Sequence, residues 1–419
     1  MSFKQISVIG LGYIGLPTAA ILSAHGYQVT GIDTNRQVVD TVNQGLIHIT
    51  EPGLASVVSC AVRDGNLRAS TQSVPADVFL IAVPTPFDDQ RQPDLSYIHA
   101  AIHSIAPKIK SGNLLVLEST SPVGTTELIA EWLHTLRPDL ALPGFSQDPD
   151  IFIAYCPERV LPGKIMSELV SNDRVIGGIT RQCAERAKAI YQRFLQGQCL
   201  LTDARTAEMC KLTENSFRDV NIAFANELSM ICQQLGIDVW QLIKLANHHP
   251  RVNILQPGPG VGGHCIAVDP WFIISKTPER ARLIRTAREV NDNKPLWVVN
   301  QVKQHLADLL NERNCQPSEI TIACFGLAFK ANIDDLRESP AIHITERLAD
   351  WHKGKLLVVE PYINQLPAVL ANKATLVEMQ QAVIDADILL MLTDHQQFTS
   401  LSEDILKSAR LVDTRGVWL

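Results

Sequence analysis

The sequence is short of charged and aromatic side chains, and no charge of one sign dominates it. Charged residues make up 19% of the 419 residues, aromatic residues 6%, and the formal net charge is −7. This mild acidity argues against a nucleic-acid surface, which needs a basic patch, but local Arg and Lys residues still permit an anionic substrate. Hydrophobic residues make up 46% of the chain, which argues against intrinsic disorder.

Long apolar runs are missing as well. No stretch reaches the roughly 20 residues that a transmembrane helix needs. The first residues, MSFKQISVIG, run directly into a strand-like segment and lack the basic segment, apolar stretch and cleavage site of a signal peptide. We therefore expect a cytoplasmic protein that is not bound to a membrane.

Paired motifs for disulfides or metals are also absent. The nine cysteines are scattered and odd in number, no C-x-x-C pair occurs, and no Cys/His cluster has the spacing of a zinc site. The pattern predicts reduced thiols that mostly fill the core, and no bound metal.

The sequence does contain strand-like segments that alternate with helical ones, which predicts parallel sheets with crossover helices. The first six strand-like runs lie at about 6–10, 27–33, 78–86, 114–124, 151–158 and 173–178. Two helical stretches, 206–234 and 279–312, follow, and strand-like runs return after Glu319. We predict an α/β fold in which two Rossmann-like, doubly wound parallel-sheet domains, residues 1–200 and 313–419, are joined by a central helical region, residues 201–312.

Three glycines follow the first strand-like segment. Gly10, Gly12 and Gly15 form G-x-G-x-x-G at a helix start, where backbone N–H groups can approach a pyrophosphate. Asp33 ends the second strand-like segment, and its carboxylate can accept hydrogen bonds from a ribose diol. Because that carboxylate would repel a 2′-phosphate, NAD is favoured over NADP as cofactor, although Arg36 lies nearby. The alternatives are an ordinary tight turn for the glycines and a surface turn residue for Asp33.

Several polar residues lie just past later strand-like segments. Thr85, Thr120 and Thr126 are candidate helix caps, and they are equally candidates for cofactor contact, because ligands bind beyond the carboxyl ends of parallel strands. Glu158, in YCPERVLPG, is a candidate general base, water-holder or helix cap.

A cysteine in a glycine-rich loop is the first candidate for covalent chemistry. Cys265 lies in PGPGVGGHCIAVDP, preceded by His264 and followed by Asp269, whereas a structural cysteine usually lies in an apolar strand or helix. Such a loop can bring backbone N–H groups close to a reacting atom, and a thiolate is a good nucleophile. The alternative is a buried cysteine beside an ordinary glycine turn.

Lys211, Asn215 and Arg218 form a second candidate group. Their spacing places them on one face of the helix at 206–234. Two cations and an amide suit an oxyanion, and the alternative is a solvated stripe on an amphipathic helix. Other cations before the cysteine loop and near strand ends of the last domain suggest phosphate binding. They are Arg251, Lys330, Arg337 and Arg415.

Five motifs give the chain a specific resemblance: VIGLGYIGLP, ESTSPVG, EMCKLTENSFRDVNIAFANEL, GPGVGGHCIAVDP and FGLAFKANIDDLRESPA. With them the sequence resembles the UDP-glucose/GDP-mannose dehydrogenase family along essentially its full length. The resemblance implies an N-terminal Rossmann domain for NAD, a long central helix that builds a homodimer, and a C-terminal Rossmann-like domain for the UDP part. It also implies a four-electron oxidation of a UDP-sugar's primary alcohol to a carboxylate, through a thiohemiacetal and a thioester on one cysteine.

The same resemblance implies roles for single residues. Cys265 matches the nucleophile, Lys211 and Asn215 match a lysine and its partner one turn on, and Asp269 matches an acid that orients or activates water, a task for which Glu158 is the alternative. The substrate-contact positions are Arg159, Val160, Lys211, Asn215, Arg218, His249, Arg251, Gly262, Phe329, Lys330 and Arg415. The NAD-contact positions are Gly10, Gly12, Tyr13, Ile14, Gly15, Asp33, Thr85, Thr120, Thr126 and Arg337. In related enzymes the arginine at the position of Arg251 reaches the active site of the neighbouring subunit.

Two departures from the family pattern bear on the sugar. Val268 replaces a lysine that many UDP-glucose enzymes have beside the acid, and Pro162 replaces a second glutamate after Glu158. Both resemble the N-acetylhexosamine branch, so UDP-N-acetyl-D-mannosamine is the first expected substrate, with bacterial surface polysaccharide as the expected use of its uronate. UDP-N-acetylglucosamine and UDP-glucose follow. Two rival functions stay open: a two-electron dehydrogenase of the β-hydroxyacid type, and an NAD-binding scaffold without catalysis.

Overall fold

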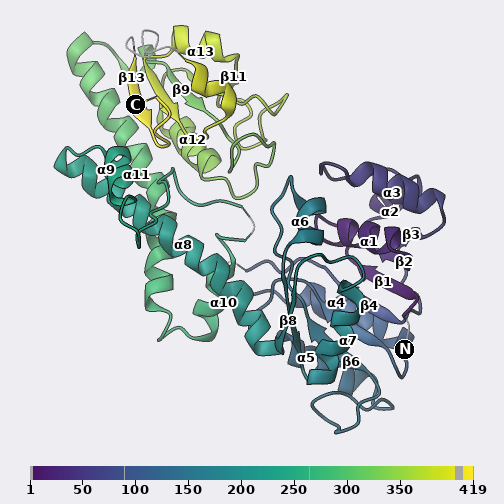
Figure 1. Ribbon diagram of the computed structural model, residues 1–419. Helices are drawn as coiled ribbons and strands as arrows, with labels where there is room; N and C mark the ends of the chain where they lie inside the picture. Colours follow the sequence, from purple (N-terminus) through teal and green to yellow (C-terminus); the bar gives the residue numbers. More distant parts are fainter. Residues whose placement is uncertain (1–2, 89, 264, 402–408, 419) are drawn as a thin grey trace. The chain divides into compact units, whose positions relative to one another are not determined.

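The computed structural model describes residues 3–88, 90–263, 265–401 and 409–418. His264, which precedes the candidate nucleophile, lies outside these residues. The chain forms two compact units. The first unit comprises Met1–Glu214 and Trp271–Pro278, and the second comprises Asn215–Pro270 and Glu279–Leu419 (Figure 1).

The first unit contains an eight-stranded sheet in the order β3-β2-β1-β4-β5-β6-β7-β8. Its strands are β1 (Gln5–Ile9), β2 (Gln28–Ile32), β3 (Leu67–Ser70), β4 (Val78–Ile81), β5 (Leu114–Leu117), β6 (Phe152–Tyr155), β7 (Arg174–Gly178) and β8 (Cys199–Asp203). The order of strands reverses between β1 and β4, and ligands bind at such switch points in open α/β sheets.

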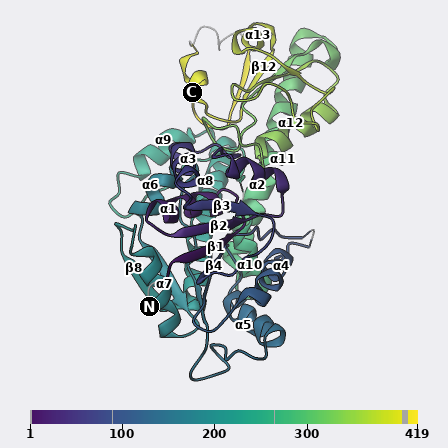
Figure 2. The same cartoon turned by 90° about the vertical axis from the view of Figure 1, so that its right-hand side faces the viewer.

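Helices cover both faces of this sheet (Figure 2). They are α1 (Gly15–Ala24), α2 (Arg36–Asn43), α3 (Leu54–Arg63), α4 (Ser96–Ile105), α5 (Thr125–Leu136), α6 (Ile165–Ser171) and α7 (Arg181–Tyr191), with the short 3-10 turn η1 (Ala106–Lys108) after α4. Successive strand residues alternate between two cores: Val78 and Leu80 pack with α1, α3, α6 and α7, whereas Phe79 and Ile81 pack with α4 and α5. Apolar residues therefore run without interruption along the central strands, as expected for a sheet buried on both faces.

One edge of the sheet departs from the expected parallel arrangement. β7 pairs antiparallel with β6, and β8 then pairs parallel with β7. The connection from Cys156 to Asp173 re-enters the sheet at the end where β6 leaves it, so no crossover separates these two strands. The prediction of parallel strands is confirmed for β1 to β6 and wrong for β7 relative to β6.

Two long helices occupy the middle of the sequence, as predicted. α8 (Ala204–Leu235) and α11 (Arg282–Arg313) match the helical stretches expected at 206–234 and 279–312. Two shorter helices that the sequence pattern did not separate lie between them, α9 (Val239–Ala246) and α10 (Asp269–Lys276). Residues 252–263 and 265–268, rich in glycine and proline, form neither helix nor strand.

The second unit contains a five-stranded sheet in the order β11-β10-β9-β12-β13, in which every strand pair is parallel. Its strands are β9 (Ile322–Phe325), β10 (Leu356–Val359), β11 (Thr375–Leu376), β12 (Ile388–Met391) and β13 (Arg410–Asp413). α11 and α12 (Pro340–Trp351) pack on one face, and α13 (Met379–Asp385) packs on the other. The 3-10 turns η2 (Pro317–Glu319) and η3 (Gln396–Ser400) complete the unit. Among the described residues, no helix is long and apolar enough to cross a membrane.

Candidate active site

The glycine loop of the first unit joins β1 to α1, and its three glycines meet different constraints. Gly10 has φ +90°, and a Cβ on it would lie 2.6 Å from the carbonyl oxygen of Ala82 at the end of β4. A Cβ on Gly15 would lie 1.8 Å from the carbonyl oxygen of Gly10. A Cβ on Gly12, in contrast, would have no described atom within 4 Å. The fold itself requires Gly10 and Gly15, whereas Gly12 leaves open space at the N-terminus of α1, where a pyrophosphate can approach the backbone.

Asp33 follows β2 and lies beside this loop. Its Oδ2 accepts a hydrogen bond from Leu11 N at 3.0 Å, and its Oδ1 accepts one from Asn35 N at 2.9 Å. The carboxylate is half-buried, so its position is fixed while part of its surface stays accessible. Tyr13 and Ile14 are half-buried on the same loop. These residues fit a dinucleotide whose pyrophosphate lies over Gly12 and whose ribose hydroxyls approach Asp33.

The three threonines have different partners. The Thr85 hydroxyl donates to the carbonyl oxygen of Thr120 at 2.5 Å, which joins the segments that follow β4 and β5. Thr126 is fully buried, and both its N–H (2.8 Å) and its hydroxyl (2.6 Å) donate to Glu208 Oε1 of α8. Glu208 Oε2 also accepts from Gly124 N at 2.6 Å. The Thr126 hydroxyl thus donates to α8, and its expected contact with the cofactor stays a prediction.

Glu158 is held inside the first unit by both of its carboxylate oxygens. Oε2 forms an ion pair with Arg174 at 3.0 Å, and Oε1 accepts from Arg159 N at 2.9 Å. Both charged side chains are buried, and the Arg174 guanidinium also lies over the Tyr191 ring at 4.6 Å. Glu158 therefore fastens the start of the 158–165 loop. One partner on each oxygen fixes the orientation of the carboxylate, and the roles expected for Glu158, general base, water-holder or helix cap, stay predictions.

A second buried carboxylate belongs to the same cluster. Glu118, directly after β5, accepts a hydrogen bond from the Tyr191 hydroxyl at 2.7 Å through Oε1, and its Oε2 has no partner among the described atoms. Burial raises the pKa of Glu118 to about 7, an effect that Arg174 opposes and Glu158 reinforces. Two buried glutamates therefore lie close to a single buried arginine.

The loop that carries Arg159 and Val160 is fastened along its length. The Arg159 side chain forms an ion pair with Glu214 of α8 at 2.8 Å, and its carbonyl oxygen accepts from Asn172 Nδ2 at 3.1 Å. Further on, Glu51 accepts from Gly163 N at 2.8 Å and from Ile165 N at 2.7 Å. The backbone of these proposed substrate-contact residues is therefore fixed by buried or half-buried polar side chains.

The candidate catalytic residues of α8 are buried. Lys211 and Asn215, one turn apart on the same face, are 8% and 5% exposed, whereas Arg218 at the next turn is exposed. Asn215 Nδ2 donates to Asp269 Oδ2 at 2.5 Å, and Asp269 itself is only 2% exposed. The Lys211 ammonium has no hydrogen-bond or ion-pair partner among the residues that the structure describes. An ammonium and an amide one turn apart on a mostly buried helix face suit the stabilisation of an oxyanion.

Cys265 lies in the turn that leads into α10, and it is exposed, unlike most of the nine free cysteines. Its carbonyl oxygen accepts from Val268 N at 3.1 Å and from Asp269 N at 2.8 Å, so the thiol lies one turn before the acid that binds Asn215. The alternative of a buried cysteine does not hold, and the exposed position agrees with a reactive thiol.

The glycines before Cys265 are needed for close packing within the second unit. A Cβ on Gly262 would lie 2.5 Å from the carbonyl oxygen of Glu338 and 2.9 Å from Phe329 Cβ. A Cβ on Gly263 would lie 3.0 Å from the Phe329 ring. Two of the predicted substrate-contact residues, Gly262 and Phe329, are therefore in contact.

The predicted phosphate-binding cations occupy different settings. Arg415 forms an ion pair with Asp394 at 2.8 Å, and a Cβ on Gly258 would lie 2.8 Å from its Nη1, so the guanidinium covers the start of the cysteine loop. Lys330 is half-buried. Three more of the predicted ligand-contact residues are exposed: His249, Arg251 and Arg337, the last in an ion pair with Asp335 at 2.7 Å.

Sequence patterns did not single out several residues that support these sites. Glu208, Arg174, Glu118 and Asn226 are buried and polar, and Asn226 Oδ1 accepts from Gly258 N at 2.8 Å. Each of these residues contacts a segment that is distant in the sequence. The sequence feature that could have identified them is a charged or amide residue in an otherwise apolar stretch. No group of three His, Cys, Asp or Glu residues within the described ranges could hold a metal ion.

Comparisons with known proteins identify the family of the chain. Models of the UDP-glucose/GDP-mannose dehydrogenase family match it in three parts: the NAD binding domain at residues 4–195, the central domain at 205–293 and the UDP binding domain at 323–419.

Similar proteins cover the full length. The UDP-N-acetyl-D-mannosamine dehydrogenase of Escherichia coli K12 is 62% identical over 419 residues, which is 100% of both chains. An NDP-N-acetyl-D-galactosaminuronic acid dehydrogenase of Ralstonia nicotianae is 59% identical over 100% of this chain and 97% of its own. Among solved structures, a UDP-D-ManNAc dehydrogenase from Pyrococcus horikoshii superimposes with a TM-score of 0.88 at 39% identity, covering 99% of this chain and 96% of that one.

Proposed function

Because the chain belongs to the UDP-glucose/GDP-mannose dehydrogenase family and carries its NAD-binding domain, we propose that it oxidises the C6 alcohol of UDP-N-acetyl-D-mannosamine to the carboxylate. The observation that carries the chemistry is the exposed thiol of Cys265, one turn before an Asp269 carboxylate that is hydrogen-bonded to Asn215. An exposed cysteine next to a buried, oriented acid suits covalent catalysis followed by hydrolysis.

The proposed reaction consumes one alcohol and one water and releases a carboxylate. NAD, when bound, accepts a hydride in each of two successive oxidations. The C6 alcohol first loses a hydride and its hydroxyl proton and becomes an aldehyde. The Cys265 sulfur then bonds to C6 to give a thiohemiacetal, which loses the second hydride and a proton and becomes a thioester. Water attacks the thioester, the C–S bond breaks, and the thiol is regenerated. Two NADH, one carboxylate and three protons are formed per alcohol.

Residues of α8 and α10 have distinct tasks in this proposal. The Lys211 ammonium and the Asn215 amide stabilise the negative oxygen on C6, a contribution typically worth about 10²–10³ in rate for one donor. Asp269 orients the hydrolytic water and accepts its proton. Glu158 is assigned to positioning, since Arg174 and the Arg159 N–H occupy its two oxygens.

The identity of the sugar is supported by the relatives and by two residues. The relatives from Escherichia coli and Pyrococcus horikoshii are named for N-acetylmannosamine, and Val268 and Pro162 replace a lysine and a glutamate of many UDP-glucose enzymes. The galactosaminuronic acid relative, at 59% identity, makes the configuration of the hexosamine the point to test.

A panel of nucleotide sugars tests the proposal. NADH formation and uronate formation are measured together for UDP-N-acetylmannosamine, UDP-N-acetylglucosamine, UDP-N-acetylgalactosamine and UDP-glucose. We expect the highest kcat/KM with the first and a ratio of two NADH per uronate. A ratio of one would support the two-electron alternative, and NAD binding without reduction on any sugar would support a scaffold.

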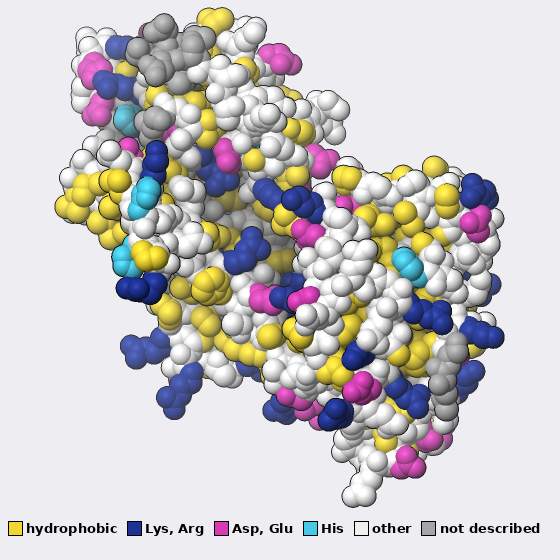
Figure 3. All heavy atoms as spheres, in the orientation of Figure 1, with side chains coloured by type: hydrophobic (Ala, Val, Ile, Leu, Met, Phe, Trp, Pro, Cys, Tyr) yellow, Lys and Arg dark blue, Asp and Glu magenta, His cyan; other side chains and the backbone are white. Residues whose placement is uncertain are grey.

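We further propose that the enzyme is a cytoplasmic homodimer with three domains, residues 1–200, 201–312 and 313–419. The family models, which match 4–195, 205–293 and 323–419, support this division. Exposed apolar residues support the dimer: Phe217, Phe224 and Ile231 repeat every seventh residue along α8 (67%, 52% and 43% exposed). Figure 3 shows hydrophobic side chains at the surface over α8 and α9.

Sedimentation velocity tests the dimer with a matched pair of variants. Phe224→Asp should yield monomers, because it places a charge in the proposed interface. Leu46→Asp, at an exposed leucine of the first unit, should remain dimeric. A dimeric Phe224→Asp variant would place the interface elsewhere. In related enzymes the Arg251 position serves the neighbouring site, and the exposure of Arg251 agrees with such a role.

A further inference from the structure

The first strand of each unit is followed by the same backbone arrangement. In the first unit, Gly10 N donates to the carbonyl oxygen of Ile32, and Leu11 N donates to the Asp33 carboxylate at 3.0 Å. In the second unit, Gly326 N donates to the carbonyl oxygen of Val359, and Leu327 N donates to Glu360 Oε2 at 2.7 Å. Gly326 also shares the φ of +90° found at Gly10. Glu360, directly after β10, therefore occupies the position that Asp33 occupies after β2.

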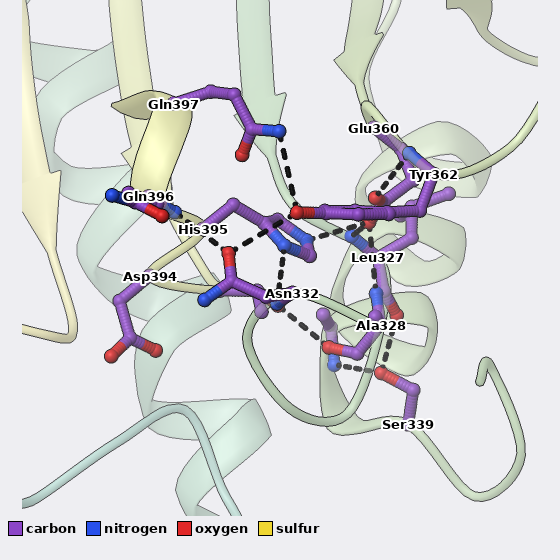
Figure 4. A network of polar contacts seen from close by, with 12 residues as sticks. Leu327, Ala328, Asn332, Ser339, Glu360, Tyr362, Asp394, His395, Gln396 and Gln397 are labelled. Carbon is purple, nitrogen blue, oxygen red and sulfur yellow. Dashed lines mark hydrogen bonds and ion pairs between the residues drawn. The ribbon is translucent and has the colours of Figure 1, made fainter. Parts of the chain in front are cut away.

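The two acids differ in accessibility. Asp33 is half-buried and open on one side, whereas Glu360 is 4% exposed. Figure 4 shows the reason: the His395 ring lies against Glu360, with Nε2 at 3.1 Å from Glu360 Oε2. The same oxygen accepts from Ala328 N at 3.1 Å. Three donors thus surround one carboxylate oxygen, and they lower the pKa of Glu360 although burial alone would raise it. The acid is no longer free to bind a ribose diol.

His395 also holds a second point of the loop that follows β9. Its Nδ1 accepts a hydrogen bond from Asn332 N at 2.9 Å, so the neutral ring donates through Nε2 to Glu360. The side chain of Asn332, a residue with φ +62°, accepts from Gln396 N at 2.9 Å. The ring is fully buried, and the Tyr362 ring lies over it at 5.0 Å between centroids. Leu327, Ala328 and Asn332 are therefore tied to one histidine–glutamate pair.

Three residues lie between these tethers, Phe329, Lys330 and Ala331, and the first two are proposed substrate-contact positions. The Phe329 ring in turn packs on Gly263 of the cysteine loop. The segment that carries His395 makes two further contacts. Asp394 forms an ion pair at 2.8 Å with Arg415, which follows β13. The Thr393 hydroxyl donates to the carbonyl oxygen of Ala328 at 2.6 Å. Residues 393–395 thus connect to Arg415 and to the loop that carries Lys330.

We propose that His395 is a positioning residue for the UDP-sugar site, because together with Glu360 it holds both ends of the segment that presents Phe329 and Lys330. Glu360, at the position that Asp33 occupies in the first unit, is hydrogen-bonded to His395 and to the loop backbone, so it anchors the loop and does not bind a ligand. The inference rests on the proposed function, since it requires this unit to bind UDP. His395 contacts neither the reacting carbon nor the cofactor in this role, and its loss acts through the loop.

The experiment compares three substitutions of His395 with a matched control. His395→Leu removes both contacts. His395→Asn keeps an acceptor near the position of Nδ1 for Asn332 N, and His395→Gln keeps a donor near the position of Nε2 for Glu360. The control is His352→Gln, at another buried histidine of the same unit, whose Nε2 is 2.9 Å from the carbonyl oxygen of Ile320 rather than near the loop. Binding of UDP and of NAD is measured separately by calorimetry, together with KM and kcat.

We expect His395→Leu to weaken UDP binding about tenfold or more, since two buried hydrogen bonds are lost, while NAD affinity stays within about twofold. KM for the UDP-sugar should rise more than kcat falls. His395→Asn should recover part of the UDP affinity, and the His352→Gln control should bind both ligands as wild type does.

Three results would overturn the inference. One is a folded His395→Leu variant that binds UDP as tightly as wild type, and another is an equal loss of UDP and NAD affinity, which indicates general damage. If His395→Leu does not fold, the two other variants provide the test. The inference is then wrong if His395→Asn and His395→Gln both bind UDP as tightly as wild type does. If the wild-type protein binds no UDP, the proposed function itself is wrong. This result differs from those that contradict only the role of His395.

Discussion

Replacement of Glu118 by Gln should change how the stability of the protein depends on pH. Burial raises the pKa of Glu118 from its ordinary value of 4.5 to about 7. Between these two values the folded state keeps a proton that the unfolded state has released, so the unfolding free energy of the wild type falls as pH rises from about 4.5 to about 7. A pKa difference of this size corresponds to roughly 3 kcal/mol of stability lost at pH 8.

The Glu118→Gln variant should not show this loss of unfolding free energy as pH rises. Its amide oxygen can still accept the hydrogen bond that the Tyr191 hydroxyl donates to Glu118 at 2.7 Å, and it never ionises. We expect the variant to match wild type near pH 5 and to exceed its unfolding free energy by up to about 3 kcal/mol at pH 8.

Urea unfolding at pH 5, 6, 7 and 8 measures the difference between the two proteins at each pH. Glu131→Gln, at an exposed glutamate of α5, is the control and should show no such pH dependence. A difference between Glu118→Gln and wild type that is the same at pH 5 and pH 8 would refute the reasoning, because the buried carboxyl group would then ionise at the same pH in both states.

Three further predictions concern the cofactor, the rate and a buried lysine. Asp33→Asn should weaken NAD binding about tenfold and reduce the preference for NAD over NADP, as measured by fluorescence titration; an unchanged preference would contradict the ribose contact. Lys211→Ala should lower kcat about 10²–10³-fold with a smaller effect on UDP affinity; a loss confined to affinity would make Lys211 a binding residue. Burial lowers the pKa of Lys294 to about 7, so wild-type unfolding free energy should rise with pH from about 7 towards 10.5. Lys294→Met should lack this rise in urea unfolding at pH 6.5 and 9, and a persistent rise would assign it to another group.

The parts of the fold that the sequence pattern predicted well are those set by local chemistry. The G-x-G-x-x-G spacing located the loop between β1 and α1, because two of its glycines meet backbone at distances that no side chain allows. The long helices α8 and α11 were predicted from apolar periodicity without breakers. Cys265 stood out because its glycine-rich surroundings are unusual for a core cysteine, and the structure places the thiol at the surface.

Features that depend on contacts between distant segments were missed or misassigned. The edge strands β3 and β8 mix polar and apolar residues, so they lack the apolar runs of the central strands. The antiparallel β7 reads like its parallel neighbours, because burial on both faces gives the same composition in either direction. Thr126 was a candidate for cofactor contact or for a helix cap, and the sequence pattern did not indicate its contact with Glu208, 82 residues further along the chain.

The same limit applies to the supporting residues of the site. Nothing in the local sequence around His395 or Arg174 distinguishes a buried positioning residue from an exposed polar one. Their roles follow from Glu360 and Glu158, which are 35 and 16 residues away along the chain. Such pairs become visible only when the fold brings the carboxylate and its donor together.

Covalent catalysis by Cys265 is tested most directly by measuring product formation by the Cys265→Ser variant supplied with NAD and UDP-N-acetylmannosamine. We expect the variant to bind both ligands as wild type does but not to release uronate over repeated turnovers, whereas wild type releases one uronate for every two NADH. Sustained uronate formation by the variant at the wild-type rate, with the same ratio of NADH, would show that no sulfur–carbon bond is needed.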